Sequence, residues 1–140
     1  MEGCLIVTYR CNAKCYMCNT WRHPSSKDAE FPPELIRKIP DGLNFVNITG
    51  GEPFLREDLC EIVEIVLDKT ARLVISTNGY FTKKIVALAE QFGDRIAFRI
   101  SIVGLPAAND ELRGIKDGFD HGLRRLVTLH DLGIKDIGFG

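Results

Sequence analysis

The segment CLIVTYRCNAKCYMC, residues 4–18, joins a run of apolar residues to three closely spaced cysteines. Its first part, residues 4–9, has the length and apolar character of a buried strand. Directly after that strand, Cys11, Cys15 and Cys18 form a C-x3-C-x2-C arrangement. The segment therefore predicts a strand whose carboxyl end presents a group of thiols.

Strand-like runs recur along the chain and alternate with helical patterns. Further strands are expected at residues 44–49, 72–76, 95–102 and 135–139. Between them, apolar residues recur at the spacing of one helix face: Leu59, Ile62, Val63 and Val66, then Phe81, Ile85, Leu88, Ala89 and Phe92, then Leu123, Leu126 and Val127. Strands that alternate with helices predict an α/β fold with one parallel sheet and right-handed crossovers.

Proline and glycine positions agree with these boundaries and leave two long loops. Pro33 suits the first turn of a helix, and Gly93 and Gly133 stand where helices are expected to end. The pattern thus amounts to about five strands and four helices. Residues 10–31 and 104–119 are expected to be irregular, and loops of that length inside a compact domain are usually functional.

Composition limits the kind of protein. A chain of 140 residues with 45% hydrophobic content supports a single domain, residues 1–140, with a buried core. Lysine and arginine total 18 against 19 acidic residues, without blocks of like charge, so neither a nucleic-acid nor a membrane partner is indicated. No apolar stretch approaches a membrane span and no secretory signal opens the chain, so we expect a cytoplasmic location.

The last predicted strand, residues 135–139, has no helix after it. A parallel strand in last place leaves an unpaired edge and an uncovered face. We therefore expect a domain that is incomplete at its C-terminus, and we expect the exposed sheet edge to favour self-association.

The cysteine count argues against a disulfide framework. Five cysteines are an odd number, and three of them fall within eight positions. In a reducing compartment such a group is more often a metal site. Cys4, in an apolar run, and Cys60, after a helix start, are interpreted as ordinary buried small residues.

Three thiolates define an incomplete ligand set. A structural zinc site normally needs four protein ligands, whereas His23, His121 and His130 are scattered along the chain. A cubane iron–sulfur cluster held by four cysteines also needs one ligand more than the motif supplies. Three cysteines on such a cluster leave one iron open for another ligand.

A C-x3-C-x2-C arrangement at the end of a first strand resembles the motif of the radical S-adenosylmethionine (SAM) superfamily. The resemblance implies that Cys11, Cys15 and Cys18 bind a [4Fe–4S] cluster whose fourth iron chelates the amino and carboxylate groups of SAM. Before the third cysteine, the family often has an aromatic residue that packs near the adenine. Here that position is Met17, with Tyr16 one place earlier.

A second motif, Gly50-Gly51-Glu52-Pro53, follows the second predicted strand. Glycines allow the backbone to approach a ligand closely, and a glutamate offers an acceptor for an ammonium group. The motif is similar to the GGEP sequence of the family, which implies binding of the SAM amino group. Alone, the string would also suit an ordinary turn between a strand and a helix.

Weaker matches lie at the ends of the third and fourth predicted strands, where parallel α/β folds gather ligand contacts. Ser76, Asn78 and Ser101 resemble family positions that meet the ribose or the methionine carboxylate of SAM, although a turn or a cap would also explain them. The acid that many relatives carry after the position of Ser101 is missing. Arg113 and the glycine after it resemble an Arg-Gly pair of the family, but we interpret Arg113 as a solvated side chain.

The resemblance implies an enzyme with a partial barrel of six strand-and-helix units. An electron donor reduces the cluster, SAM is cleaved to methionine and a 5′-deoxyadenosyl radical, and the radical abstracts hydrogen from a peptide or small-molecule substrate that the sequence does not identify. One alternative is a non-enzymatic zinc module on Cys11, Cys15 and Cys18 with a fourth ligand such as His23. Another is a ligand-free binding domain in which the cysteines are merely reactive thiols.

Overall fold

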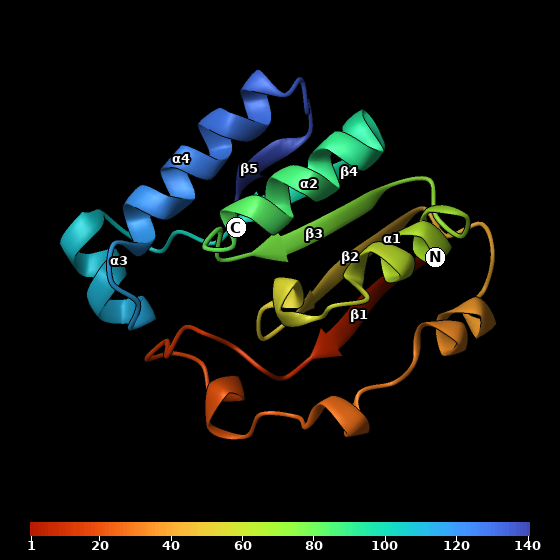
Figure 1. The fold of residues 1–140 in the computed structure, drawn as a ribbon, viewed down its shortest axis with the longest axis horizontal. Helices are drawn as coiled ribbons and strands as arrows, with labels where there is room; N and C mark the ends of the chain where they lie inside the picture. Colours follow the sequence, from red (N-terminus) through yellow and green to blue (C-terminus); the bar gives the residue numbers. More distant parts are fainter.

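The computed structural model describes residues 1–140 as one parallel sheet of five strands in the order β1-β2-β3-β4-β5 (Figure 1). The strands are β1 (Glu2–Thr8), β2 (Phe45–Gly50), β3 (Leu73–Thr77), β4 (Ile96–Ile100) and β5 (Ile137–Phe139). Each strand is thus the spatial neighbour of the next strand in the sequence, as in one side of a strand-and-helix barrel. The predicted α/β class and parallel sheet are confirmed.

Four α-helices connect the later strands: α1 (Leu59–Leu67), α2 (Thr82–Phe92), α3 (Pro106–Arg113) and α4 (Gly118–Asp131). Helices α1, α2 and α4 cover one face of the sheet (Figure 1). Gly93 caps the end of α2, and Gly133, just beyond α4, has a positive φ of 82°, as predicted for helix ends.

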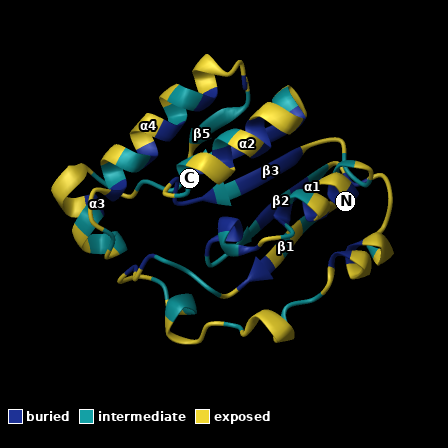
Figure 2. Cartoon of the chain, in the orientation of Figure 1, coloured by how far each residue is buried: buried dark blue, intermediate teal, exposed yellow.

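The main core lies between the sheet and these helices. Ile48, Ile75, Phe98 and Ile137 occupy one row across four strands, since each pairs in register with the next. Helix residues such as Ile62 pack on the same core, and Figure 2 shows the buried residues on the helix faces that meet the sheet. Ile137 is half-buried, whereas the others are fully buried, and each fully buried side chain contributes about 1.5–3 kcal/mol of hydrophobic stabilisation.

Three predictions differ from the structure. Pro33 begins a helical segment, as predicted, but the segment is a short 3-10 helix, Pro33–Lys38, which ends before Ile39 because the residue before a proline disfavours helical backbone. Residues 104–119 are not irregular throughout, since they hold α3 and the first two residues of α4. Cys4 is exposed rather than buried, because it points away from the helix-covered face of the edge strand β1.

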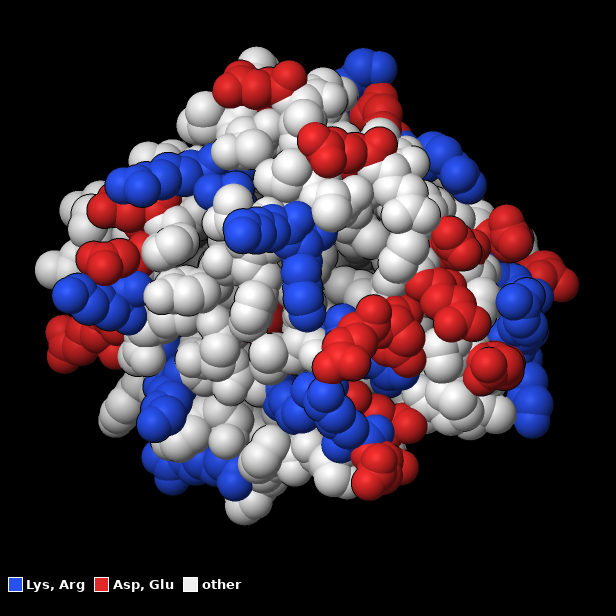
Figure 3. Space-filling view, in the orientation of Figure 1, with Lys and Arg blue, Asp and Glu red and all other residues white.

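Charge is unevenly distributed over the surface. Acidic side chains gather over α1 on the face shown in Figure 3, where Glu57, Glu61, Glu64 and Asp68 line a shallow groove. By contrast, residues 9–27 contain no acidic residue. None of the helices combines the length and the apolar composition needed to span a membrane.

Candidate functional site

A cavity of about 320 Å³ opens at the carboxyl ends of the strands. Residues from both motifs and from the ends of three strands line it together. The predicted site residues among them are Cys11, Cys15, Met17, Cys18, Gly50, Gly51, Ser76, Asn78 and Ser101. Parallel strands place their carboxyl ends at one edge of a sheet, so segments that are far apart in the sequence meet there.

The two glycines bring the second motif against the start of the cysteine loop, residues 10–31. Gly51 N–H donates to the Thr8 carbonyl and Glu52 N–H to the Arg10 carbonyl, both at 2.8 Å. A Cβ on Gly51 would lie 2.1 Å from the Arg10 oxygen, and one on Gly50 would lie 2.3 Å from the Thr8 oxygen. The glycines are therefore required by backbone contact between the two motifs, in addition to any approach of a ligand.

Glu52 lies behind the cavity wall and is fully buried. Its carboxylate accepts hydrogen bonds from Phe54 N–H at 3.1 Å, from the Thr77 hydroxyl at 2.8 Å and from Asn78 N–H at 2.8 Å. Burial raises the pKa of Glu52, although these three donors act in the opposite direction. A carboxylate has about four acceptor positions, so one remains for a further donor. Pro53 is also buried and begins a 3-10 helix, Pro53–Leu55.

The three motif cysteines differ in their surroundings. Cys15 is buried, whereas Cys11 and Cys18 are half-buried. Burial raises the pKa of the Cys11 thiol. Hydrogen bonds with the Thr20 hydroxyl at 3.2 Å and with Thr20 N–H at 3.5 Å lower the pKa of the Cys18 thiol. The Cys18 thiol is therefore more readily ionised than the Cys11 thiol.

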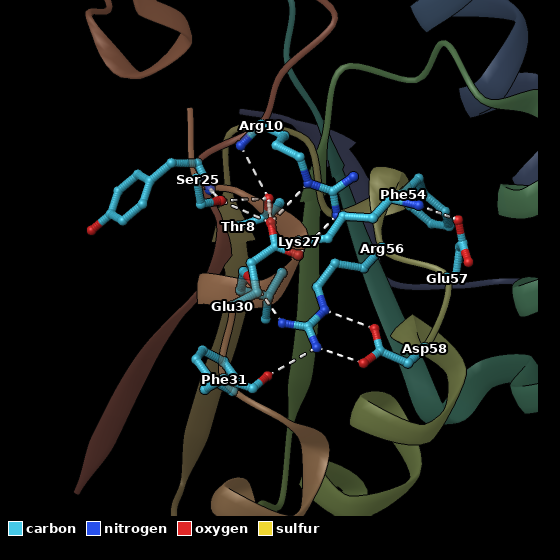
Figure 4. A network of polar contacts seen from close by, with 12 residues as sticks. Thr8, Arg10, Ser25, Lys27, Glu30, Phe31, Phe54, Arg56, Glu57 and Asp58 are labelled. Carbon is cyan, nitrogen blue, oxygen red and sulfur yellow. Dashed lines mark hydrogen bonds and ion pairs between the residues drawn. The ribbon is translucent and has the colours of Figure 1, made fainter. Parts of the chain in front are cut away.

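A network of polar contacts closes the cysteine loop at its base (Figure 4). The Glu30 carboxylate accepts from the Arg10 guanidinium through two bonds of 2.8 Å, from the Ser25 hydroxyl at 2.8 Å and from the Thr8 hydroxyl. Arg10 directly precedes Cys11, so the pair joins the two ends of a loop that has only short 3-10 turns of its own.

Arg56 makes a second connection at the same place (Figure 4). Its guanidinium donates to the Val7 and Phe31 carbonyls, both at 3.0 Å, and forms a two-bond ion pair with Asp58. The Arg56 side chain is 4% exposed. Strand β1, the far end of the cysteine loop and the start of α1 are thereby held together.

Arg113 is a cavity residue that the sequence interpretation assigned to solvent. The C-terminal end of α3 packs on the cysteine loop: Lys14 N–H donates to the Arg113 carbonyl at 3.1 Å and Tyr16 N–H to the Leu112 carbonyl at 2.7 Å. Gly114 follows in a left-handed conformation, and a Cβ there would lie 2.6 Å from the Lys14 oxygen. The Arg-Gly pair in the sequence was thus the signal that could have placed Arg113 at the cavity, because only a glycine allows the close contact with Lys14.

The remaining predicted residues lie at the cavity in varied ways. Ser76 donates to the Asn47 side chain at 3.0 Å, and the Asn78 side chain donates to that of Asn12 at 2.8 Å. Met17 lines the cavity but is 57% exposed, whereas Tyr16 is 86% exposed and is not among the lining residues. The substitution of methionine for an aromatic residue therefore leaves that part of the wall without a ring.

The donor set fits an iron–sulfur cluster better than a single ion. Nowhere in the chain do three side chains of His, Cys, Asp or Glu lie close enough together to hold one metal ion. His23, the fourth ligand in the zinc alternative, is exposed and does not line the cavity. A cluster instead takes each thiolate on a different iron, which suits three sulfurs that share a cavity without converging on one point.

Comparisons with known proteins agree with this geometry. The family model of the radical SAM superfamily matches residues 5–140. A Fe-coproporphyrin III synthase from Methanosarcina barkeri is 35% identical over 138 residues, which cover 92% of this chain and 34% of that protein. A probable GTP 3′,8-cyclase from Methanocaldococcus jannaschii is 35% identical over 112 residues, which cover 76% of this chain and 36% of that protein.

The fold is also that of a solved structure. SuiB from Streptococcus suis, in a crystal structure with bound S-adenosylmethionine, superposes with a TM-score of 0.76 at 20% identity, over 96% of this chain and 32% of that chain. The same protein bound to its precursor peptide SuiA gives a TM-score of 0.76. The chain therefore spans about a third of the length of each of these proteins.

Proposed function

The chain belongs to the radical SAM superfamily, and on that premise we propose that it carries the cluster-binding and SAM-binding part of an enzyme that cleaves SAM reductively. The superfamily uses a [4Fe–4S] cluster and SAM, and the relatives described above are enzymes. The observation that carries the proposal is the shared cavity: Cys11, Cys15 and Cys18 line it together with both glycines of the second motif.

Each residue has a distinct part in this proposal. Cys11, Cys15 and Cys18 would each hold one iron of the cluster, and the iron without a cysteine would be left for SAM. Gly50 and Gly51 expose backbone at the cavity wall, and Glu52 keeps one acceptor position that suits an ammonium group. When bound, the cluster supplies the single electron that cleaves SAM to methionine and a 5′-deoxyadenosyl radical.

Polar groups around the same wall suit the rest of the cofactor. The backbone and hydroxyl groups at Ser76 and Ser101 and the Asn78 side chain offer donors and acceptors to a ribose or a carboxylate. Arg113 contributes positive charge that lowers the pKa of Cys11 and Glu52 against the larger effect of burial. At Cys18 the same charge lowers the pKa in the same direction as the hydrogen bonds with Thr20. A cation at this position would favour thiolate ligands and an anionic ligand group.

The proposal includes two partners, an electron donor and a substrate, each named only by its class. The chemistry needs an electron donor, and the exposed outer side of the cysteine loop around Tyr16 and Met17 offers the nearest approach for one. The relatives include a Fe-coproporphyrin III synthase, a GTP 3′,8-cyclase and a mycofactocin maturase, so we keep the substrate as a peptide or a small molecule. Thiols that must remain reduced suit a cytoplasmic location.

Anaerobic reconstitution with iron and sulfide tests the proposal, using the longest natural polypeptide that contains this chain. We expect a brown protein that forms 5′-deoxyadenosine from SAM after chemical reduction. Cys15→Ala should abolish both colour and product. Cys60→Ala is the matched control, because Cys60 lies on α1 away from the cavity, and it should retain both.

A second variant separates the two halves of the site. Glu52→Ala should weaken SAM binding in equilibrium dialysis while the cluster absorbance persists, because no cysteine is changed. Full iron loading in Cys15→Ala would overturn the ligand set, and unchanged SAM affinity in Glu52→Ala would overturn the assigned role of the second motif.

A further inference from the structure

Trp21 lines the cavity although neither motif contains it. It lies in the 3-10 helix Thr20–Arg22, directly after the third motif cysteine and its neighbour. Among the residues that line the cavity, Trp21 is the only aromatic one, and it is also the only tryptophan in the chain. It is half-buried and does not belong to the hydrophobic core, so its packing in the fold does not account for its position.

Two contacts fix the orientation of the indole. Its N–H donates to the Cys15 carbonyl at 3.0 Å, which ties the ring to the middle of the cysteine motif. The Arg22 guanidinium lies 5.0 Å from the ring centroid, a cation–π contact. The ring is therefore held in place before any ligand binds, which lowers the entropic cost of using it as a binding surface.

The cavity otherwise has little that a flat heteroaromatic ring would pack on. Its other large apolar side chains are Met17, which is 57% exposed, and Val103, which is 40% exposed. Most of the remaining wall consists of thiols, hydroxyls and glycine backbone. SAM carries a purine, and stacking on an aromatic side chain is a general way for proteins to bind bases.

We propose that Trp21 is the surface on which the adenine ring of SAM stacks. This inference rests on the proposed function, since it takes SAM as the ligand of the cavity. It assigns to Trp21 a contact that the sequence had placed at Met17. The indole N–H on Cys15 gives the residue a second effect, because adenine binding and the cysteine motif would then be mechanically connected.

Variants separate stacking from the hydrogen bond. Trp21→Phe keeps an aromatic face but loses the N–H to Cys15, whereas Trp21→Leu loses both. Tyr16→Leu is the matched control, because it removes an aromatic ring from the same loop at a position outside the cavity wall. Circular dichroism and cluster absorbance confirm that each variant folds and loads iron.

Equilibrium dialysis of the reconstituted proteins then measures three probes: SAM, 5′-deoxyadenosine and methionine. We expect Trp21→Leu to bind SAM and 5′-deoxyadenosine about tenfold more weakly, with methionine binding unchanged. Trp21→Phe should recover most of the affinity, and Tyr16→Leu should match the wild type. In the wild type, 5′-deoxyadenosine should change the tryptophan emission, and in Trp21→Leu the same addition should leave the emission unchanged.

The outcomes distinguish this inference from the proposed function. Wild-type affinity for SAM in Trp21→Leu, or unchanged emission on saturation with 5′-deoxyadenosine, overturns the stacking while the proposed function stands. Equal losses in the Phe and Leu variants also overturn it, because the hydrogen bond to Cys15 would then be the cause. A reconstituted wild-type protein that binds no SAM overturns the proposed function and this inference with it.

Discussion

Arg10 and Glu30 are 20 residues apart in the sequence, yet their side chains meet in an ion pair with two N···O distances of 2.8 Å (Figure 4). All three motif cysteines lie on the segment that this pair closes. The Arg10 carbonyl also accepts the Glu52 N–H, so one residue connects the loop closure, the cysteine motif and the glycine motif. The positions of the three thiols therefore depend on the ion pair between Arg10 and Glu30, although neither residue is a proposed cluster ligand.

Glu30→Gln should destabilise the fold by about 2 kcal/mol, because the charge that receives Arg10 in a largely buried position is lost. Urea denaturation of the cluster-free protein measures the free energy of unfolding. Glu57→Gln is the control, since Glu57 pairs with Lys27 on the exposed surface, where ion pairs contribute little. A loss of equal size in the two variants would contradict the prediction.

The same carboxylate predicts a pH dependence. Burial alone raises the pKa of Glu30, but hydrogen bonds from Arg10, Thr8 and Ser25 outweigh it and lower the pKa from its ordinary 4.5 to about 2. A group whose pKa is lowered on folding stabilises the protein above the pKa of the unfolded chain and loses that contribution as the pH falls toward the folded value.

The difference in unfolding free energy between wild type and Glu30→Gln should therefore be constant above about pH 5.5 and shrink steadily below about pH 4.5. Urea titrations at several pH values, with Glu57→Gln alongside, measure this difference. A difference that stays constant or grows under acid conditions would show that Arg10 and the hydroxyls do not hold the carboxylate in its charged form.

The sequence predicted the sheet well because its strands have strong local patterns. Residues of β3 and β4 are buried on both faces, so they form the continuous apolar runs that are typical of parallel strands. Helix α3 had no comparable pattern, since Asn109 is its only buried residue. Its position depends on contacts with the cysteine loop, which local periodicity does not encode.

Part of the candidate site was predicted because it depends on the strands. Motif residues sit at strand ends, and the topology of a parallel sheet brings those ends together. Arg113 and Trp21 reach the cavity through a helix terminus and a loop turn. The glycine after Arg113 was the available signal for the first, and nothing in the local sequence of Trp21 indicates the direction of the second. The sequence also did not predict that Glu30 and Arg56 hold the cysteine loop in place, because their partners lie far away in the chain.

Thr20→Val should make the Cys18 thiol harder to ionise. The Thr20 hydroxyl and N–H lower the pKa of Cys18, and valine keeps the shape and the N–H but removes the hydroxyl. Iodoacetamide alkylation of the cluster-free protein, followed by peptide mass spectrometry, reports each cysteine separately. We expect several-fold slower alkylation of Cys18 at pH 7.5.

Cys11 is the internal control for that experiment, because burial rather than Thr20 sets the direction of its pKa shift. Its alkylation should be slower than that of Cys18 in the wild type and unchanged by the substitution. Equal slowing at both positions would indicate a general closure of the loop, and an unchanged rate at Cys18 would remove Thr20 as the cause.

Gly51→Ala should be strongly destabilising, because the new methyl group would lie 2.1 Å from the Arg10 carbonyl oxygen, and that oxygen belongs to the backbone. The strain can be relieved only by separating the two motifs, which breaks the hydrogen bond from Glu52 N–H to Arg10. We expect a loss of about 3 kcal/mol in unfolding free energy and faster hydrogen exchange at the Glu52 amide. Gly3→Ala is the control, since a Cβ there meets Val46 at an ordinary 3.5 Å and should cost little. A Gly51→Ala protein as stable as Gly3→Ala, with its Glu52 amide still protected, would show that the two motifs do not need this close backbone contact.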